Sequence, residues 1–205
     1  AEAGGMTQKQ IETIWHSVEN LYKTGNSPLI NLCIRRKGQI ILNRSLGYAQ
    51  GNTLDGLSNT AQIANVDTPV CLFSASKMIT AMLIHLLDES GEINLLDPVS
   101  HYIPEYAQNG KRRATIFHLL SHRGGIPRVE TEVTPELLFD KERILQELYA
   151  SKPLAPAGNQ LAYHAVTAGY ILGEIIERVT GQDIRQFLHE KIEKPMGMQY
   201  FNYGL

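Results

Sequence analysis

The spacing of apolar and polar residues along the first third of the chain predicts one helix and a pair of strands. Residues 7–23 repeat Ile, Trp, Val and Leu at helical spacing, and Thr7 is placed to cap the start of that helix. Two largely apolar, partly β-branched runs, 29–35 and 39–48, predict a β-hairpin whose strands are buried on both faces. The polar stretch 49–68, rich in Gly, Asn and Thr, is expected to be a loop.

From residue 70 onward the pattern is mostly helical. A short apolar run at 70–73 reads as a strand and leads into a helix predicted over about residues 75–89. Further helices are predicted over residues 115–120, 134–150, 164–181 and 182–192. No strong strand pattern follows residue 73.

These elements predict an α/β fold in two parts. Residues 1–73 would form an antiparallel sheet flanked by helices, and residues 74–205 a mostly helical region of the same domain. Two strands alone are marginally stable in water. We therefore expect the C-terminal strands of the sheet to be absent from this chain, so that a missing segment or a second chain completes an otherwise incomplete domain.

Composition narrows the class of protein. Of the 205 residues, 43% are hydrophobic and 20% charged, with a formal net charge of -2. No basic stripe indicates a nucleic-acid partner, and no run approaches the roughly 18 apolar residues of a membrane span. The two cysteines, Cys33 and Cys71, lie in apolar strand-like runs and are predicted to be buried free thiols.

The stretch FSASKMITAMLIHLL places a serine and a lysine one helical turn apart. At the start of a helix, the Ser74 hydroxyl would be open to a substrate, and its own N–H would be one of the free donors there. Lys77 is expected to lie inside the protein against Met78 and Met82. Burial would favour its neutral amine, and a neutral amine beside a hydroxyl is a general base beside a nucleophile.

A Ser-x-x-Lys pattern is also expected about once by chance in a chain of this size. Ser74 could be a plain N-cap, and the Lys77 side chain could extend to solvent. Two details favour the catalytic interpretation: no other serine here has a lysine three residues on, and this one stands where a predicted strand meets a helix.

Several blocks of this sequence, taken in order, resemble blocks of a known protein family. The chain resembles the serine β-lactamase and penicillin-binding-protein superfamily, in the class C β-lactamase-like branch that includes esterases. The resemblance covers residues 29–205 and is carried, in order, by FSASKMITAMLIHLLDESGEINLLDPVSHYIPEY, ATIFHLLSHRGGIPR, LAYHAVTAGYILGEIIERVTG and IEKPMGMQYFNYGL.

The resemblance implies three catalytic residues. Ser74 matches the acylated nucleophile, and Lys77 matches the base that takes its proton. Tyr163 matches the tyrosine that shares this proton and passes it to the leaving group. A tyrosine beside a lysine can become partly phenolate, because a nearby positive charge stabilises the anion.

The chain departs from the family pattern at two places. Family β-lactamases and peptidases carry Tyr-x-Asn, whose Asn binds the substrate amide, whereas this chain has Tyr163-His164-Ala165. Ala165 cannot make that hydrogen bond, so the site should discriminate less well for acylamino substrates. The family's later Lys-Thr-Gly-like motif, whose strand supplies a second oxyanion-hole N–H, is not in this sequence.

The resulting prediction is a serine hydrolase acting through an acyl-enzyme on Ser74, most simply a carboxylesterase that transfers the acyl group to water or an alcohol. Substrate contacts are expected from His164 and Ala165, and the substrate is a small ester or amide. One alternative is a β-lactamase or D-amino-acid peptidase. Another is a non-catalytic ligand-binding or scaffold member of the fold.

No metal or organic cofactor is expected. His118 and His122 stand four residues apart, a spacing that can bind a metal on a helix. No Glu follows the first His as in zinc proteases, and no third ligand is evident. Both histidines are therefore interpreted as part of a structural block.

Overall fold

A computed structural model describes residues 2–53 and 55–204. The chain forms two compact units, residues 1–71 and residues 72–205, and each unit has its own hydrophobic core. The first unit contains every strand found in the described residues, and the second is helical. The predicted α/β fold with an antiparallel sheet and a helical region is confirmed.

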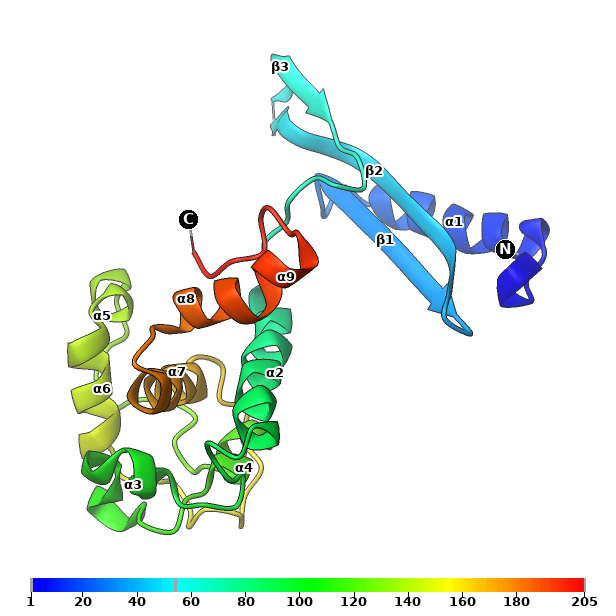
Figure 1. Ribbon diagram of the computed structural model, residues 1–205. Coiled ribbons are helices and arrows are strands. Elements are labelled where there is room, and N and C mark those ends of the chain that lie inside the picture. The colour runs from blue at the N-terminus through cyan, green and yellow to red at the C-terminus, as the bar shows by residue number, and fades with distance from the viewer. Residues whose placement is uncertain (1, 54, 205) are drawn as a thin grey trace. The chain divides into compact units, whose positions relative to one another are not determined.

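The first unit is a three-stranded antiparallel sheet with one long helix packed beside it (Figure 1). Its strand order is β1-β2-β3. The elements are a 3-10 turn at Glu2–Gly4, helix α1 at Gln8–Tyr22, and strands β1 (Leu29–Arg36), β2 (Gln39–Thr53) and β3 (Gly56–Ile63).

Helix α1 starts where the sequence predicts. The Thr7 hydroxyl accepts the N–H of Gln10, and the Gln10 side chain accepts the N–H of Thr7, so two backbone donors at the helix start are satisfied. The apolar face of α1 packs on the sheet, where Ile11, only 2% exposed, forms the core with Ile41 and Leu42.

The predicted loop at 49–68 is wrong over most of its length. Strand β2 continues to Thr53, and β3 pairs with it from residue 56 to 63. Both segments are polar and largely exposed, so they lack the apolar alternation by which a half-buried strand is recognised. Gly51 fits here for two reasons: its φ is 78°, and a Cβ atom would lie 2.6 Å from the Ala61 Cα of β3.

The prediction that β1 and β2 are buried on both faces is also wrong. Most residues of β1 are only partly buried, because Leu32 and Ile34 contact the core on one face while Cys33 alternates to the other and is exposed. Cys71 is exposed as well, so neither cysteine is the buried thiol that the sequence predicted. The expectation that a later segment or a second chain adds strands to this sheet stays a prediction.

The second unit packs its helices around α7 (Figure 1), which contacts α2, α3, α4, α6 and α8. Its helices are α2 (Ser76–Glu89), α3 (Val99–Tyr102), α4 (Ile116–Leu120), α5 (Pro135–Phe139), α6 (Lys141–Ala150), α7 (Thr167–Thr180), α8 (Ile184–Leu188) and α9 (Lys194–Met196), with 3-10 turns at Phe73–Ala75 and Pro104–Gly110 and a π turn at His189–Glu193. None of the helices in the described residues combines the length and apolarity that a membrane crossing requires.

Three predicted elements differ from the structure. Residues 70–72 are not a strand but lead into the 3-10 turn that begins at Phe73. The single helix predicted over 134–150 is broken at Asp140, whose side chain leaves the helix pattern to accept the N–H of Arg143 and cap α6. The last helix continues past residue 192 through the π turn into α9.

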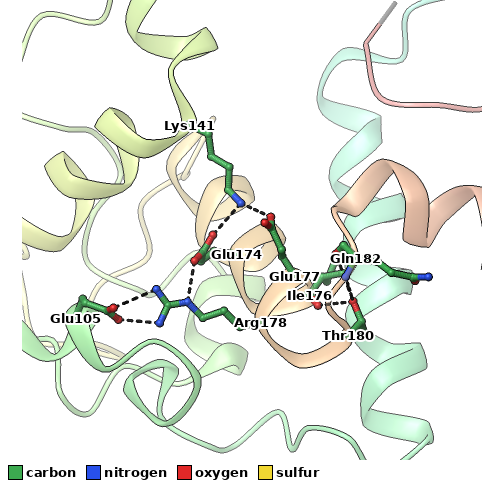
Figure 2. Close-up of polar contacts among 8 residues, drawn as sticks. All are labelled: Glu105, Lys141, Glu174, Ile176, Glu177, Arg178, Thr180 and Gln182. Carbon is green, nitrogen blue, oxygen red and sulfur yellow. Dashed lines mark hydrogen bonds and ion pairs between the residues drawn. The ribbon is translucent and has the colours of Figure 1, made fainter.

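A chain of ion pairs ties α7 to its neighbours (Figure 2). Arg178 donates from Nη1 to Glu105 at 2.9 Å and from Nε to Glu174 at 2.8 Å. The other Glu174 oxygen accepts from Lys141 Nζ at 2.9 Å, and the same ammonium group pairs with Glu177. Burial would raise the pKa of Glu174, but the hydrogen bonds from Arg178 and Lys141 hold it below its ordinary value. The network therefore joins α6 and the turn at 104–110 to α7.

Lys111 makes a second set of polar contacts in the helical unit, and its side chain is buried completely. Lys111 is 1% exposed, and its Nζ donates to the carbonyl oxygens of Tyr149 at 2.9 Å and Ser151 at 2.5 Å. These carbonyls close the C-terminal end of α6, where a cation is electrostatically favoured. The ammonium group also lies 5.4 Å from the centre of the Tyr106 ring. Burial lowers the pKa of Lys111 to about 8.

Candidate active site

Ser74 lies in the 3-10 turn that opens helix α2. The preceding residue, Phe73, has a φ of 46°, a left-handed conformation that is rare for a bulky residue and costs about 1–3 kcal/mol. The Ser76 hydroxyl donates to the Phe73 carbonyl and holds this turn. As a result, Ser74 is exposed at the N-terminus of α2, and its N–H donates to no backbone acceptor in the described part of the chain.

The three predicted catalytic side chains meet at the Ser74 hydroxyl. Lys77 donates from Nζ to Ser74 Oγ at 3.2 Å, across one turn of helix. Tyr163, 89 residues further along the chain, donates from its phenol to the same Oγ at 2.7 Å. The Lys77 Nζ lies 5.1 Å from the centre of the Tyr163 ring. One hydroxyl is thus hydrogen-bonded by both groups that could take its proton.

The expected burial of Lys77 is wrong. Lys77 is only half-buried, and Met78 and Met82 on the same helix are 64% and 50% exposed. Helix α2 presents only one face to the core, through Leu83 and Leu87. Lys77 therefore contacts Ser74 directly while part of its side chain stays accessible to water.

Tyr163 is 53% exposed and is electrostatically distinct from the buried tyrosines. Its hydrogen bond with Ser74 and then the nearby Lys77 lower the pKa of its phenol. Burial instead raises the pKa of Tyr149 to about 12, and it also raises the pKa of Tyr106, Tyr170 and Tyr203. Tyr163 is therefore placed to share a proton at a pH where the buried phenols stay neutral.

We expect one tyrosine to ionise at lower pH than the buried ones in a spectrophotometric titration. Phenolate absorbance would be followed between pH 7 and 12 for the wild-type protein and for Tyr163→Phe. The substitution should remove the earliest step and leave the later ones, because only the Tyr163 phenol lies beside Lys77. Tyr200→Phe, at an exposed position, is the matched control. An unchanged early step in Tyr163→Phe would contradict this assignment.

The two predicted substrate-contacting residues are placed differently. Ala165 is exposed and lines the cavity beside Lys77. His164 is only 1% exposed, and its Nδ1–H donates to the Ala162 carbonyl at 2.6 Å while Nε2 accepts the N–H of Ile126 at 3.1 Å. Burial lowers the pKa of His164, which favours this neutral form. His164 therefore supports the loop under the site rather than facing a ligand.

His122 is part of the site, although its sequence context suggested only a structural block. Its ring lies 4.8 Å from the Tyr163 ring, centre to centre, and lines the same cavity as Lys77 and Ala165. Burial and then the charge of Lys77 lower the pKa of His122. Its position within the quoted block ATIFHLLSHRGGIPR was the available signal, but its contact with Tyr163 depends on tertiary packing.

A cavity of about 600 Å³ opens beside these residues within the second unit. Its walls are mainly apolar, with Leu119, Val166, Tyr170 and Phe139 among them. Gly169 of α7 also lines the cavity and has open space where a side chain would stand. The cavity therefore offers room for an apolar group next to Lys77.

His118 and His122 each use one ring nitrogen to accept a backbone hydrogen bond. His118 Nδ1 accepts the N–H of Thr115, and His122 Nδ1 accepts the N–H of His164. Across residues 2–53 and 55–204, no group of three or more His, Cys, Asp or Glu side chains is arranged to hold a metal ion.

The chain is similar in sequence and in fold to known proteins. A family model described as Beta-lactamase matches residues 16–205. Among curated proteins, the chain is similar to the esterase/beta-lactamase LipL of Mycobacterium tuberculosis, with 31% identity over 140 residues, which is 68% of this chain and 32% of LipL.

Two solved structures have the same fold over nearly all of the chain. A penicillin-binding protein homolog from Caulobacter crescentus superposes with a TM-score of 0.78 at 29% identity, covering 94% of this chain and 50% of that one. A family VIII carboxylesterase superposes with a TM-score of 0.78 at 27% identity, covering 94% and 51%. The chain thus spans about a third to a half of the length of these relatives.

Proposed function

Because the chain belongs to the beta-lactamase family, we propose that it is a serine hydrolase that forms an acyl-enzyme on Ser74. The observation that carries this proposal is the convergence of Lys77 and Tyr163 on the Ser74 hydroxyl, at 3.2 and 2.7 Å. A nucleophile within hydrogen-bonding reach of a general base is the arrangement by which a serine is activated, and Ser74 has two such candidates.

The proposed reaction has two steps. Ser74 Oγ bonds to the carbonyl carbon of the ester while its proton passes to the Lys77 amine or the Tyr163 phenolate. The carbon–oxygen bond to the alcohol then breaks, and the alcohol leaves with that proton. In the second step, water or another alcohol attacks the acyl-enzyme and gives up its proton to the same pair. The bond between the acyl carbon and Ser74 Oγ then breaks, and Oγ takes up that proton.

The N-terminus of α2 contributes to stabilising the charged intermediate. The Ser74 N–H donates to no backbone acceptor in the described residues, so it is free to bind the oxygen that becomes negative, and the positive end of the helix dipole favours negative charge there. The Ser74 N–H is one of the two donors that an oxyanion hole normally uses. Removing one donor typically costs about 100- to 1000-fold in rate.

We propose a carboxylic ester as the substrate. Ala165 presents a methyl group where an amide-binding site would need a polar side chain, so an acylamino group gains nothing there. The neighbouring cavity is mostly apolar and suits the acyl chain of a small ester. The solved carboxylesterase among the structural relatives agrees with this choice.

The test compares p-nitrophenyl butyrate with nitrocefin under identical conditions. We expect ester turnover to exceed β-lactam turnover clearly, because only the β-lactam depends on the missing amide contact. Faster turnover of nitrocefin would instead support a β-lactamase, a name that LipL also carries. No turnover of either substrate, together with no fluorophosphonate adduct in the intact protein mass, would support a non-catalytic role.

A further inference from the structure

We propose that His122 is a positioning residue that holds the Tyr163 phenol on the Ser74 hydroxyl. This inference rests on the proposed function of Ser74 and adds a residue to it. His122 would act through Tyr163 and would not itself touch the reacting atoms.

His122 contacts the chain on both sides of Tyr163. Its carbonyl oxygen accepts the N–H of Ala162 at 3.0 Å, and its ring Nδ1 accepts the N–H of His164 at 3.1 Å. Its ring packs against the Tyr163 ring, with the centres 4.8 Å apart. His122 therefore holds both chain neighbours of Tyr163 by hydrogen bonds and contacts the Tyr163 ring directly.

The backbone of His122 is in the left-handed conformation, which few residues other than glycine adopt. Its φ is 58°, just past the end of α4, where glycine is the usual residue. Glycine would adopt this conformation without a steric cost, whereas another residue costs about 1–3 kcal/mol. The presence of a side chain here therefore calls for a compensating role, and the contacts to Tyr163 and His164 provide one.

His164 packs against His122 from beneath the site. The buried His164 stacks 5.9 Å from the His122 ring and hydrogen-bonds the Ala162 carbonyl and the Ile126 N–H. Because His122 Nδ1 accepts a hydrogen bond, its neutral ring carries the proton on Nε2. The described residues give Nε2 no partner, so Nδ1 is the nitrogen with a structural task.

The experiment uses a matched pair of substitutions, His122→Asn and His122→Gln. Asparagine tolerates a positive φ and places its amide oxygen near the position of Nδ1, whereas glutamine carries the same amide one methylene further out. We expect His122→Asn to keep most of the wild-type kcat. His122→Gln should lose about 10- to 100-fold in kcat with KM nearly unchanged, as expected when a catalytic group is misplaced by roughly 1 Å.

The tyrosine titration separates a displaced Tyr163 phenol from a general loss of structure. His122→Gln should move the early tyrosine ionisation to higher pH, because Tyr163 loses its contact with Ser74 and Lys77, and His122→Asn should not. His85→Gln, at an exposed position on α2, is the control for loss of an imidazole. Thermal unfolding of all variants shows whether a loss of rate follows a loss of structure.

Two results would overturn the inference. One is an unchanged tyrosine titration in His122→Gln. The other is equal loss of kcat in both variants. Failure of the proposed function looks different: the wild-type protein itself would neither turn over ester nor take up fluorophosphonate on Ser74, while the tyrosine titration would still report whether His122 positions Tyr163.

Discussion

Replacing Ser74 by alanine is expected to lower ester hydrolysis by about 10⁴-fold or more, as removal of a catalytic nucleophile does in other serine hydrolases. The Ser74 Oγ is the atom on which Lys77 and Tyr163 converge, so neither partner has a substrate-attacking group to activate once it is gone. Hydrolysis of p-nitrophenyl butyrate measures the rate, and intact mass after fluorophosphonate treatment measures the adduct.

Ser90→Ala is the matched control for this substitution. Ser90 is exposed at the opposite end of α2, where its hydroxyl donates to the Leu87 carbonyl. The adduct should therefore persist in Ser90→Ala and disappear in Ser74→Ala. A Ser74→Ala protein that still gains the mass of the reagent would place the nucleophile elsewhere.

Ser74, Lys77 and Tyr163 are expected to act together in one catalytic step, so their substitutions should have non-additive effects on the rate. Combining Ser74→Ala with Lys77→Met is expected to cost no more than Ser74→Ala alone, because residues that act in one step have non-additive effects. A further large loss in the double variant would mean that Lys77 serves catalysis independently of Ser74.

Replacing Lys111 by methionine is expected to lower the free energy of unfolding by about 2–3 kcal/mol at pH 7. The methionine fills a similar volume but leaves the carbonyls of Tyr149 and Ser151 buried without their donor, at roughly 1–3 kcal/mol each. Relief from burying the ammonium group offsets part of this loss. Urea unfolding followed by far-UV circular dichroism reports on the helical second unit, whereas the sole tryptophan, Trp15, lies in the first.

Lys111 should also make the free energy of unfolding depend on pH. The pKa of Lys111 is about 8 in the folded protein, below the ordinary value of 10.5 for the unfolded chain. Between these values the unfolded chain binds more protons, so the free energy of unfolding rises with pH, by up to about 3 kcal/mol at 1.36 kcal/mol per unit. Below pH 8 both states are protonated and this contribution is constant.

Lys111→Met should lack this rise, so the difference in stability between wild type and variant should grow from pH 8 to pH 10. Comparing the two proteins removes the contribution of other groups that titrate in that range. Lys152→Met, at a nearby exposed lysine, is expected to leave the pH dependence unchanged. Parallel curves for wild type and Lys111→Met would contradict the lowered pKa of Lys111.

The sequence by itself determined the features that depend on a few neighbouring residues. Thr7 and Gln10 cap α1 within a single turn, and Gly181, with a φ of 73°, ends α7. The spacing of Ser74 and Lys77 places both on one helical turn wherever the helix packs. The identification of Tyr163 came from a resemblance between whole blocks of sequence, because no local pattern links residues 89 positions apart.

Only the tertiary structure decided which side chains are buried and which segments meet. It paired the polar strand β3 with β2, placed His164 beneath the site while Ala165 faces the cavity, left Lys77 partly in water, and enclosed Lys111 completely. It also brought His122 against Tyr163. The physical reason is that hydrogen-bonded caps and helical spacing are set within one or two turns of chain, whereas burial depends on which distant surfaces pack together.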